Sequence, residues 1–315
     1  MGDFTNQEYL SLQNFNHSRE DGKTIHLLVL GEVLWDIFEQ STRLGGAPLN
    51  FAAHLKRLGY DPLLISAVGN DELGARTVAG MADLGLNTRF LQRTCQFSTG
   101  TARVKLGPGD QTSFVISRPA AYDSVNISAD EATTLQAWAP AWFYYGTLLS
   151  HMPSGKAVLE QLLKALPSCL KFYDLNLRRG YESAPLVNEL LARADVVKLN
   201  EEELDTVRKF TGLPSDAESF CRDGSKRYGW RAVCVTLGAR GCAMLRGEEY
   251  VEAGGHAVEV ADPVGAGDAF AAAFLHGLIS EWPVAKIASF GNRMGALVAS
   301  RHGAIPDWTR EEVVE

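Results

Sequence analysis

The sequence has few cysteines, and none of them has a spacing typical of ligands. Its 315 residues include five cysteines, and no two of these form a Cys-x-x-Cys pair: Cys95, Cys169, Cys221, Cys234 and Cys242. A zinc site of the paired-cysteine type and a disulfide framework are therefore both poorly supported. Reduced thiols in a cytoplasm are the simplest interpretation, so we expect a cytoplasmic protein.

Long apolar runs and an excess of positive charge are also missing. No stretch reaches the roughly 18 apolar residues of a membrane-spanning helix, and residues 1–23 lack the apolar segment of a secretory signal. The formal net charge of −8 repels phosphate backbones. We therefore expect neither a membrane nor a nucleic acid as partner. We also predict that residues 1–24 form a flexible extension before one domain at 25–310.

Two common nucleotide-binding motifs are absent as well. Gly155-Lys156 is followed by alanine and has no glycine five residues before it, so it fails the Walker A pattern. No Gly-x-Gly-x-x-Gly follows the first predicted strand, which argues against a nicotinamide-dependent dehydrogenase.

Short apolar segments do alternate with helical patterns along the chain. The patterns predict strands at 26–33, 62–69, 142–145, 171–174, 196–199 and 232–237, and helices at 49–58, 72–84, 154–166, 186–193, 201–210, 268–279 and 283–300. This order is typical of an α/β fold with a mainly parallel sheet. Residues 97–118 instead alternate with period two around a turn at 107–110, which predicts a hairpin and a small lid beside the main sheet.

A glycine-rich turn leads into the helix predicted at 268–279. It contains Gly265, Ala266, Gly267 and Asp268. Small residues let an anion approach the amides at a helix start, which have no intrahelical partner, and the helix dipole adds positive potential. A carboxylate there can accept a proton from a hydroxyl while the amides stabilise a transferring phosphoryl group. On these residues alone, an ordinary aspartate after a turn is an equally good interpretation.

Five motifs in sequence order resemble those of the ribokinase-like (PfkB) carbohydrate kinases. They occupy residues 45–50, 174–178, 198–203, 235–241 and 262–270, and the likeness runs from about 25 to 306. The Gly-Gly-Ala-Pro form of the first motif is similar to that of fructokinases. The resemblance implies a three-layer α/β/α sandwich with a mainly parallel central sheet. It also implies a β lid from about 34–44 and 97–118, and an ATP-dependent sugar kinase.

The resemblance assigns a role to each matching position. It makes Asp268 the catalytic base, beside an anion hole at Gly265, Ala266 and Gly267. The sugar would be held by Asp36, Gly45, Gly46 and Asn50, and ATP by Asn200, Thr236, Gly238, Gly241 and Asn292. Glu203 would orient Mg²⁺ through waters. A monovalent cation, expected to be K⁺, would bind Asp262 and the carbonyls of Val264, Val298, Arg301 and Gly303, although ribokinases commonly have threonine at the position of Val264.

The sequence leaves the identity of the substrate open. The first motif favours fructose, phosphorylated at a primary hydroxyl. Arginines at 103, 118 and 178 could bind a sugar-acid carboxylate, which keeps 2-keto-3-deoxygluconate as an alternative, with ribose as another. A non-catalytic sugar or nucleotide sensor is disfavoured by the complete set at 265–268. We also expect a homodimer through the lid, where Ala102, Val104 and Leu106 form an apolar face that needs cover.

Overall fold

A nine-stranded sheet forms the centre of the molecule. The computed structural model describes residues 25–106 and 112–314, so the predicted extension at 1–24 and turn at 107–110 lie outside the described residues. The strand order is β13-β12-β11-β10-β9-β8-β1-β4-β5. All neighbours from β5 to β11 pair in parallel, whereas β12 and β13 add an antiparallel edge. The predicted mainly parallel sheet is thus confirmed.

The nine strands are short, and those in the middle of the sheet have mostly apolar sequences, as expected for strands covered on both faces. Their bounds are β1 His26–Leu30, β4 Asp61–Gly69, β5 Leu91–Thr94, β8 Trp142–Tyr145, β9 Leu170–Asp174, β10 Val196–Asn200, β11 Ala232–Thr236, β12 Cys242–Arg246 and β13 Glu249–Ala253. The sequence patterns predicted six of these strands and missed β5, β12 and β13. All three missed strands lie at the two ends of the sheet.

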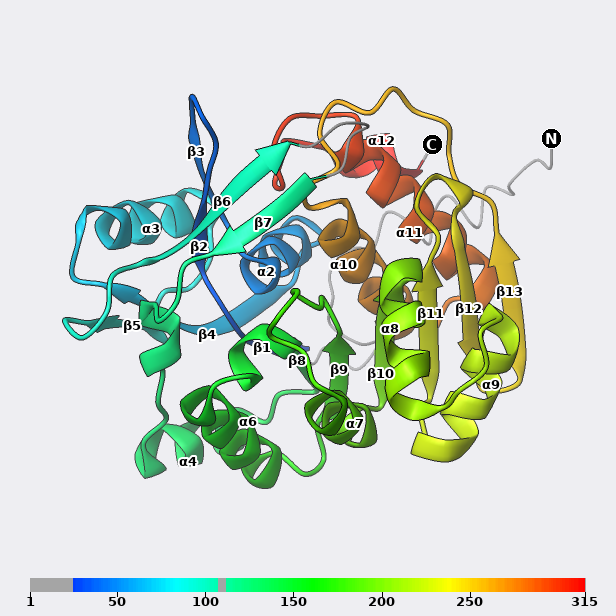
Figure 1. The fold of residues 1–315 in the computed structure, drawn as a ribbon, viewed down its shortest axis with the longest axis horizontal. Helices are drawn as coiled ribbons and strands as arrows, with labels where there is room; N and C mark the ends of the chain where they lie inside the picture. The colour runs from blue at the N-terminus through cyan, green and yellow to red at the C-terminus, as the bar shows by residue number, and fades with distance from the viewer. Residues whose placement is uncertain (1–24, 107–111, 315) are drawn as a thin grey trace.

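Helices cover both faces of the sheet, and each face has its own core (Figure 1). One core includes residues of α4 Ala129–Trp138, α6 Pro153–Ala165, α7 Ala184–Arg193, α8 Glu201–Thr211 and α9 Ala217–Tyr228. The other includes residues of α2 Ala47–Arg57, α3 Glu72–Asp83, α10 Ala266–Ile279, α11 Val284–Ala299 and α12 Arg310–Val314. Because side chains alternate along a strand, Leu28 enters the first core and Val29 the second. The predicted three-layer sandwich is confirmed.

A second, four-stranded sheet forms the lid, beside the main layers in Figure 1. It consists of β3 Thr42–Gly45, β2 Leu34–Ile37, β6 Gly100–Leu106 and β7 Thr112–Ile116, in the order β3-β2-β6-β7. The predicted hairpin is the antiparallel pair β6–β7. In β2, Asp36 lies opposite Arg43 of β3 and Ala102 of β6, so these three side chains share one face of the lid.

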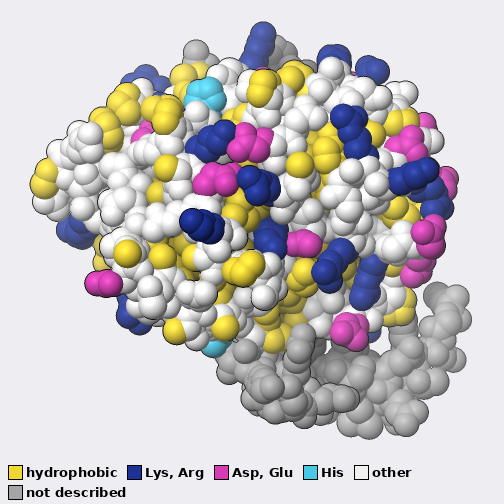
Figure 2. Space-filling view, turned by 90° about the horizontal axis from the view of Figure 1, so that it is seen from below, with side chains coloured by type: hydrophobic (Ala, Val, Ile, Leu, Met, Phe, Trp, Pro, Cys, Tyr) yellow, Lys and Arg dark blue, Asp and Glu magenta, His cyan; other side chains and the backbone are white. Residues whose placement is uncertain are grey.

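The outer surface mixes charges of both signs. On the face shown in Figure 2, basic and acidic side chains lie among one another rather than in separate patches. Within the described ranges, no helix combines the length and the hydrophobicity that a bilayer crossing requires. All five cysteines are free thiols, and only Cys95 is exposed.

His54 of α2 ties the end of the chain to the body of the protein. The Trp308 indole donates to His54 Nδ1 over 3.1 Å, so Nε2 carries the ring proton and donates to the Ala304 carbonyl over 3.0 Å. The ring is fully buried, and this burial lowers its pKa to about 4. His54 therefore stays neutral in the folded protein at ordinary pH.

We predict that this histidine makes stability fall in mild acid. The unfolded chain binds a proton at His54 near pH 6.5, whereas the folded chain resists it down to about pH 4. Between pH 8 and pH 5 the wild type should lose about 2 kcal/mol through this residue alone. His54→Gln should be less stable at pH 8 but should lose less on acidification, as measured by urea unfolding at both pH values. The exposed His256→Gln is the control. An unchanged pH dependence in His54→Gln would contradict the prediction.

Candidate active site

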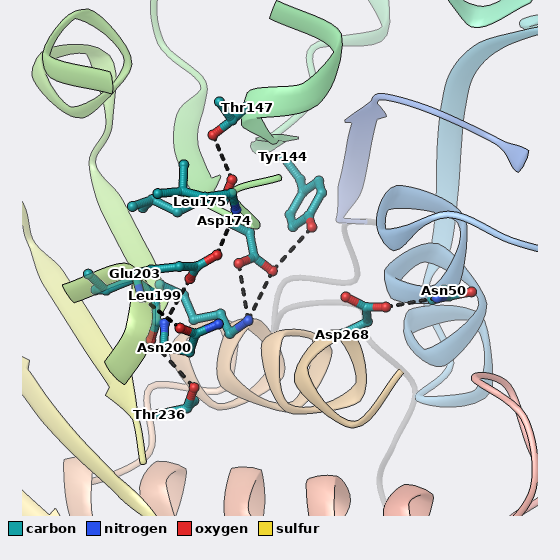
Figure 3. A network of polar contacts seen from close by, with 12 residues as sticks. Asn50, Tyr144, Thr147, Asp174, Leu175, Leu199, Asn200, Glu203, Thr236 and Asp268 are labelled. Atoms are coloured by element: carbon teal, nitrogen blue, oxygen red, sulfur yellow. Dashed lines mark hydrogen bonds and ion pairs between the residues drawn. The ribbon is translucent and has the colours of Figure 1, made fainter. Parts of the chain in front are cut away.

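The candidate site lies where the central strands end. Strand β9 ends at Asp174, β10 at Asn200 and β11 at Thr236, and the register places Asn200 beside Thr236. The start of α10 faces this edge, as the close-up in Figure 3 shows for Asp268. Ligands of open parallel sheets bind at the carboxyl ends of the strands. The fold therefore brings four of the five predicted motifs to one location, and the lid adds the fifth.

The glycine-rich turn before α10 is shaped by Gly265. Gly265 has φ 85° and precedes the first helical residue. A Cβ at this position would lie 2.5 Å from the Ala304 backbone, so no larger residue fits. The amides of Gly267 and Asp268, in the first turn, have no carbonyl four residues earlier inside the helix. The turn thus leaves first-turn amides open to an anion, as the expected anion hole would require.

Asp268 lies in the first turn of α10, and its side chain points toward the neighbouring helix α2. Its Oδ2 accepts a hydrogen bond from the Asn50 amide over 2.8 Å. Burial raises the pKa of Asp268 to about 6, while the Asn50 hydrogen bond opposes this rise. A carboxylate with such a pKa is ionised at neutral pH and is still basic enough to accept a proton.

The lid brings a second carboxylate to the same place. Asp36 of β2 is 6% exposed, and a Cβ on Gly45 would lie 2.7 Å from its Oδ2. The same Cβ would lie 4.0 Å from Asn50 Oδ1, which is buried and has no hydrogen-bond partner. Gly45 therefore lets the Asp36 carboxylate lie close to its backbone, near the unpaired amide oxygen of Asn50. Both are acceptors that suit sugar hydroxyls.

Glu32, which follows β1, is a site residue that the sequence patterns did not reveal. Burial raises the pKa of Glu32 and of Asp36, each to about 7. The nearby charge of Arg178 opposes the rise in both cases, and the charge of Asp268 adds to it. Arg178 therefore lies among these carboxylates and balances part of their charge. No motif around Glu32 distinguishes it from a strand-end acid, so only the fold could identify it.

A buried ion pair joins β9 and β10 beside the anion hole. Lys198 Nζ lies 3.1 Å from Asp174 Oδ1 and 3.3 Å from Oδ2, and the Tyr144 hydroxyl donates to Asp174 Oδ2 over 3.2 Å. Figure 3 shows Asp268 between this cluster at Asp174 and the amide of Asn50. The sequence motif at 198–203 includes Lys198, but its pattern gave the lysine no role.

The Asn-x-x-Glu motif forms a capping box at the start of α8. Asn200 Oδ1 accepts the Glu203 amide, and Glu203 Oε2 accepts the Asn200 amide, both over 2.8 Å. Glu203 Oε1 also accepts the Leu177 amide over 2.7 Å. The carboxylate therefore joins α8 to the loop after β9. Each oxygen keeps a second lone pair, so an additional water-mediated role toward Mg²⁺ is compatible with these bonds.

The predicted nucleotide residues lie near the ends of β11 and β13. Thr236 ends β11. Gly238 begins the short turn Gly238–Arg240 that leads to β12, and Gly241 follows this turn. Asn292 of α11 donates to the carbonyls of Ala253 and Gly254, over 3.1 and 3.0 Å. Its amide thus anchors the loop after β13.

Asp262, the expected ligand of a monovalent cation, already has three donors. Its Oδ1 accepts the Val264 amide over 3.1 Å, and its Oδ2 accepts the Gly303 amide over 3.0 Å. The third donor is the Arg43 guanidinium of the lid, whose Nη1 lies 2.6 Å from Oδ2. Arg43 thus supplies the positive charge that K⁺ was expected to bring. The carbonyls of Val298 and Arg301 lie in the same stretch as Gly303, and that of Val298 accepts the Arg301 amide over 3.1 Å. A cation at Asp262 would therefore have to share its carboxylate with Arg43 or displace it.

Two of the three arginines considered for a sugar acid are placed unfavourably for it. Arg103 is exposed, and it pairs with Ile37, so it lies on the lid face opposite to Asp36. Arg118 donates through Nε to Asp123 over 3.1 Å and through Nη1 to the Leu148 carbonyl over 2.8 Å. Its side chain is only 6% exposed, so it is part of a buried structural ion pair. The charge of Arg178 acts on Glu32, Asp36 and Asp268, while that of Arg118, already paired with Asp123, acts on Glu32 as well.

Comparison with known proteins agrees with this geometry. Residues 24–310 match the model of the pfkB family carbohydrate kinases. The chain belongs to the PfkB family of carbohydrate kinases. It is 30% identical to a fructokinase of Escherichia coli over 300 residues, which covers 88% of this chain and 94% of that protein. It is 28% identical to an ATP-dependent 6-phosphofructokinase of Thermoanaerobacterium thermosaccharolyticum, over 91% of this chain and 92% of that one.

Solved structures agree with the fold of this PfkB kinase. An uncharacterised sugar kinase of Pyrococcus horikoshii, crystallised in complex with ATP, is 26% identical and superposes with a TM-score of 0.77. The match covers 91% of this chain and 96% of that one. The predictions of a sugar kinase and of a ribokinase-like α/β fold are confirmed.

We predict that Asp268→Asn folds normally and loses most of its turnover. The amide can keep the contact to α2 but cannot take a proton, and loss of a general base costs about 10²–10⁴-fold in rate. In the wild type, kcat/KM should fall as pH drops below about 6, because protonation of Asp268 removes the base. Steady-state kinetics, with thermal melting as the folding check, tests both statements. Asp83→Asn, at the exposed end of α3, is the control. A kcat near that of the wild type would remove Asp268 from the mechanism.

Proposed function

We propose that this protein transfers the γ-phosphoryl group of ATP to a primary hydroxyl of a small neutral sugar, with fructose as the first candidate. The observation that carries the proposal is the meeting of Asp36, Asn50 and Asp268 beside the turn at Gly265. Asp36 and Asn50 would hold ring hydroxyls and direct one hydroxyl at Asp268. Its proton would pass to the Asp268 carboxylate as its oxygen attacks the γ-phosphorus.

The charges around the sugar space support a neutral substrate. Glu32, Asp36 and Asp268 are buried or partly buried acids, and the charge of Asp268 raises the pKa of the other two beyond the rise due to burial. A sugar-acid carboxylate would add a further negative charge to this group, at a cost in binding. Arg103 faces away and Arg118 is already held by Asp123, so Arg178 would be the main one of the three arginines positioned to compensate. The fructokinase relative supports the same choice.

We predict a substrate order for purified protein in an assay of ADP release with MgATP. D-fructose should have a kcat/KM at least tenfold above D-ribose, 2-keto-3-deoxygluconate and fructose 6-phosphate. Asp36→Asn should lower kcat/KM for fructose by about 10²-fold, because the hydroxyl is no longer held in line. A tenfold preference for the sugar acid that disappears in Arg178→Gln would instead establish the alternative substrate. Absence of phosphorylation on every sugar, despite ATP binding, would favour a sensor.

The expected cofactors are ATP, Mg²⁺ and K⁺. Across the described ranges, no three His, Cys, Asp or Glu side chains are grouped so that they could hold a metal ion. We infer that Mg²⁺ enters bound to the ATP phosphates and is oriented near Glu203, since Mg²⁺ commonly binds through one or two carboxylates, substrate phosphates and waters. Magnesium would neutralise phosphate charge during transfer.

We predict that K⁺ stimulates the enzyme weakly and that Arg43→Gln increases this stimulation. Without the guanidinium, Asp262 keeps only two amide donors, and a cation would gain a place beside it. The measurement compares kcat in potassium chloride and in tetramethylammonium chloride at equal ionic strength. Arg103→Gln, a lid arginine on the opposite face, is the control. Equal rates in both salts for the wild type and for Arg43→Gln would contradict a role of K⁺.

Dimerisation and a cytoplasmic location stay predictions. Ala102, one of the three lid residues expected to need cover, is 2% exposed within the single chain. The side chains of Val104 and Leu106 lie outside the described part of the structure. On the opposite face of the lid, Val115 is 52% exposed and is the apolar residue most open to a second copy. Light scattering at high micromolar concentration tests the dimer.

A further inference from the structure

Lys198 is a buried cation to which the proposed phosphoryl transfer assigns no role. It belongs to β10 and is 6% exposed, and its Asp174 partner at the end of β9 is fully buried. The two residues face each other across the parallel pair of strands. Opposing Coulombic effects outweigh the burial that lowers the pKa of Lys198, because its carboxylate neighbours Asp174, Glu203 and Asp268 raise it. The lysine is therefore charged in the folded protein.

The ammonium also lies against the anion hole. A Cβ placed on Gly267 would be 3.4 Å from Lys198 Nζ, and, apart from its chain neighbours and the adjacent helix backbone, no other atom would come within 4 Å of it. The open side of Gly267, where a phosphoryl group would approach the first-turn amides, is thus bordered by this lysine. An ammonium has three N–H donors, and Asp174 occupies two of their directions with its two oxygens. The third direction is available to a ligand.

A purely structural pair would be a weak explanation of this arrangement. Burying two charges costs several kcal/mol of desolvation, and apolar residues of similar volume are often as stabilising as a buried ion pair. At the opposite end of β9, Lys171 and Asp195 form a looser pair, with 3.7 Å between Nζ and Oδ2 and both side chains partly exposed. Of these two pairs, only the one at the carboxyl edge of the sheet is buried, and only that one reaches the start of α10.

We propose that Lys198 is a catalytic residue that donates to an oxygen of the transferring γ-phosphoryl group, and that Asp174 is the positioning residue that aims it. This inference rests on the proposed phosphoryl transfer. The sugar oxygen forms a bond to the γ-phosphorus, and the bond from phosphorus to the β–γ bridging oxygen breaks, with its electron pair leaving on ADP. The Asp268 carboxylate receives the hydroxyl proton. Lys198 keeps its own proton, and its positive charge balances the negative charge on the γ-phosphoryl oxygens.

The test replaces Lys198 by alanine and follows rescue by an external amine. Loss of one donor to a developing charge costs about 10²–10³-fold in kcat, so Lys198→Ala should lose this much while KM for the sugar stays within about twofold. Methylammonium should restore part of kcat in a saturable way in Lys198→Ala and should not do so in Asp268→Asn. Lys171→Ala, which breaks the ion pair at the other end of β9, is the matched control. It should keep the wild-type kcat.

A second variant keeps the test valid if alanine leaves Asp174 unpaired and unfolds the protein. The double variant Lys198→Met with Asp174→Leu removes both charges, so it should fold, as judged by thermal melting. Its kcat should still be at least 10²-fold below that of the wild type. A folded double variant with wild-type kcat would overturn the inference. So would a Lys198→Ala enzyme that changes only the sugar KM. In both of these cases the active wild type would leave the proposed function standing, whereas a wild type inactive on all sugars would overturn both.

Discussion

The site depends on one close approach, that of the Gly265 backbone to Ala304. This contact leaves no room for a Cβ on Gly265. Gly265 has φ 85°, and at this residue the chain turns into α10 with the first amides of the helix exposed. Ala304 in turn is held by the neutral ring of His54 in α2, the helix that also supplies Asn50. The glycine-rich turn, Asp268 and Asn50 are therefore parts of one packed unit.

Acids dominate the inside of this unit, and their burial has a price in stability. Burial raises the pKa of Glu32 and of Asp36 to about 7 and that of Asp268 to about 6, so ionising them in the fold is unfavourable. The charges of Arg178 and Lys198 reduce this cost without removing it. Groups with such pKa values can exchange protons near neutral pH, as a hydroxyl phosphotransferase requires.

Much of the architecture could be predicted because it follows from local patterns. Apolar runs and helix-start residues gave six central strands, the main helices and the lid hairpin, whereas β5 and β13, with Arg93, Glu249 and Glu252 among their residues, lack a continuous apolar run. The site was predicted where a role follows from position in a motif, as at Asp268. Glu32, Arg43 and Lys198 escaped because their roles arise from partners distant in sequence. Arg118 looked available only because its pairing with Asp123 is invisible without the fold.

The hydrogen bond between Asn50 and Asp268 joins residues 218 positions apart, and this separation bears on how the protein is made. At about 5–20 residues per second, the ribosome synthesises Asn50 about 10–40 seconds before Asp268. Strand β1 must also wait for β8 before both of its edges are paired. A nascent chain that has not reached α10 therefore lacks Asp268, and the contact between α2 and α10 forms only late in synthesis.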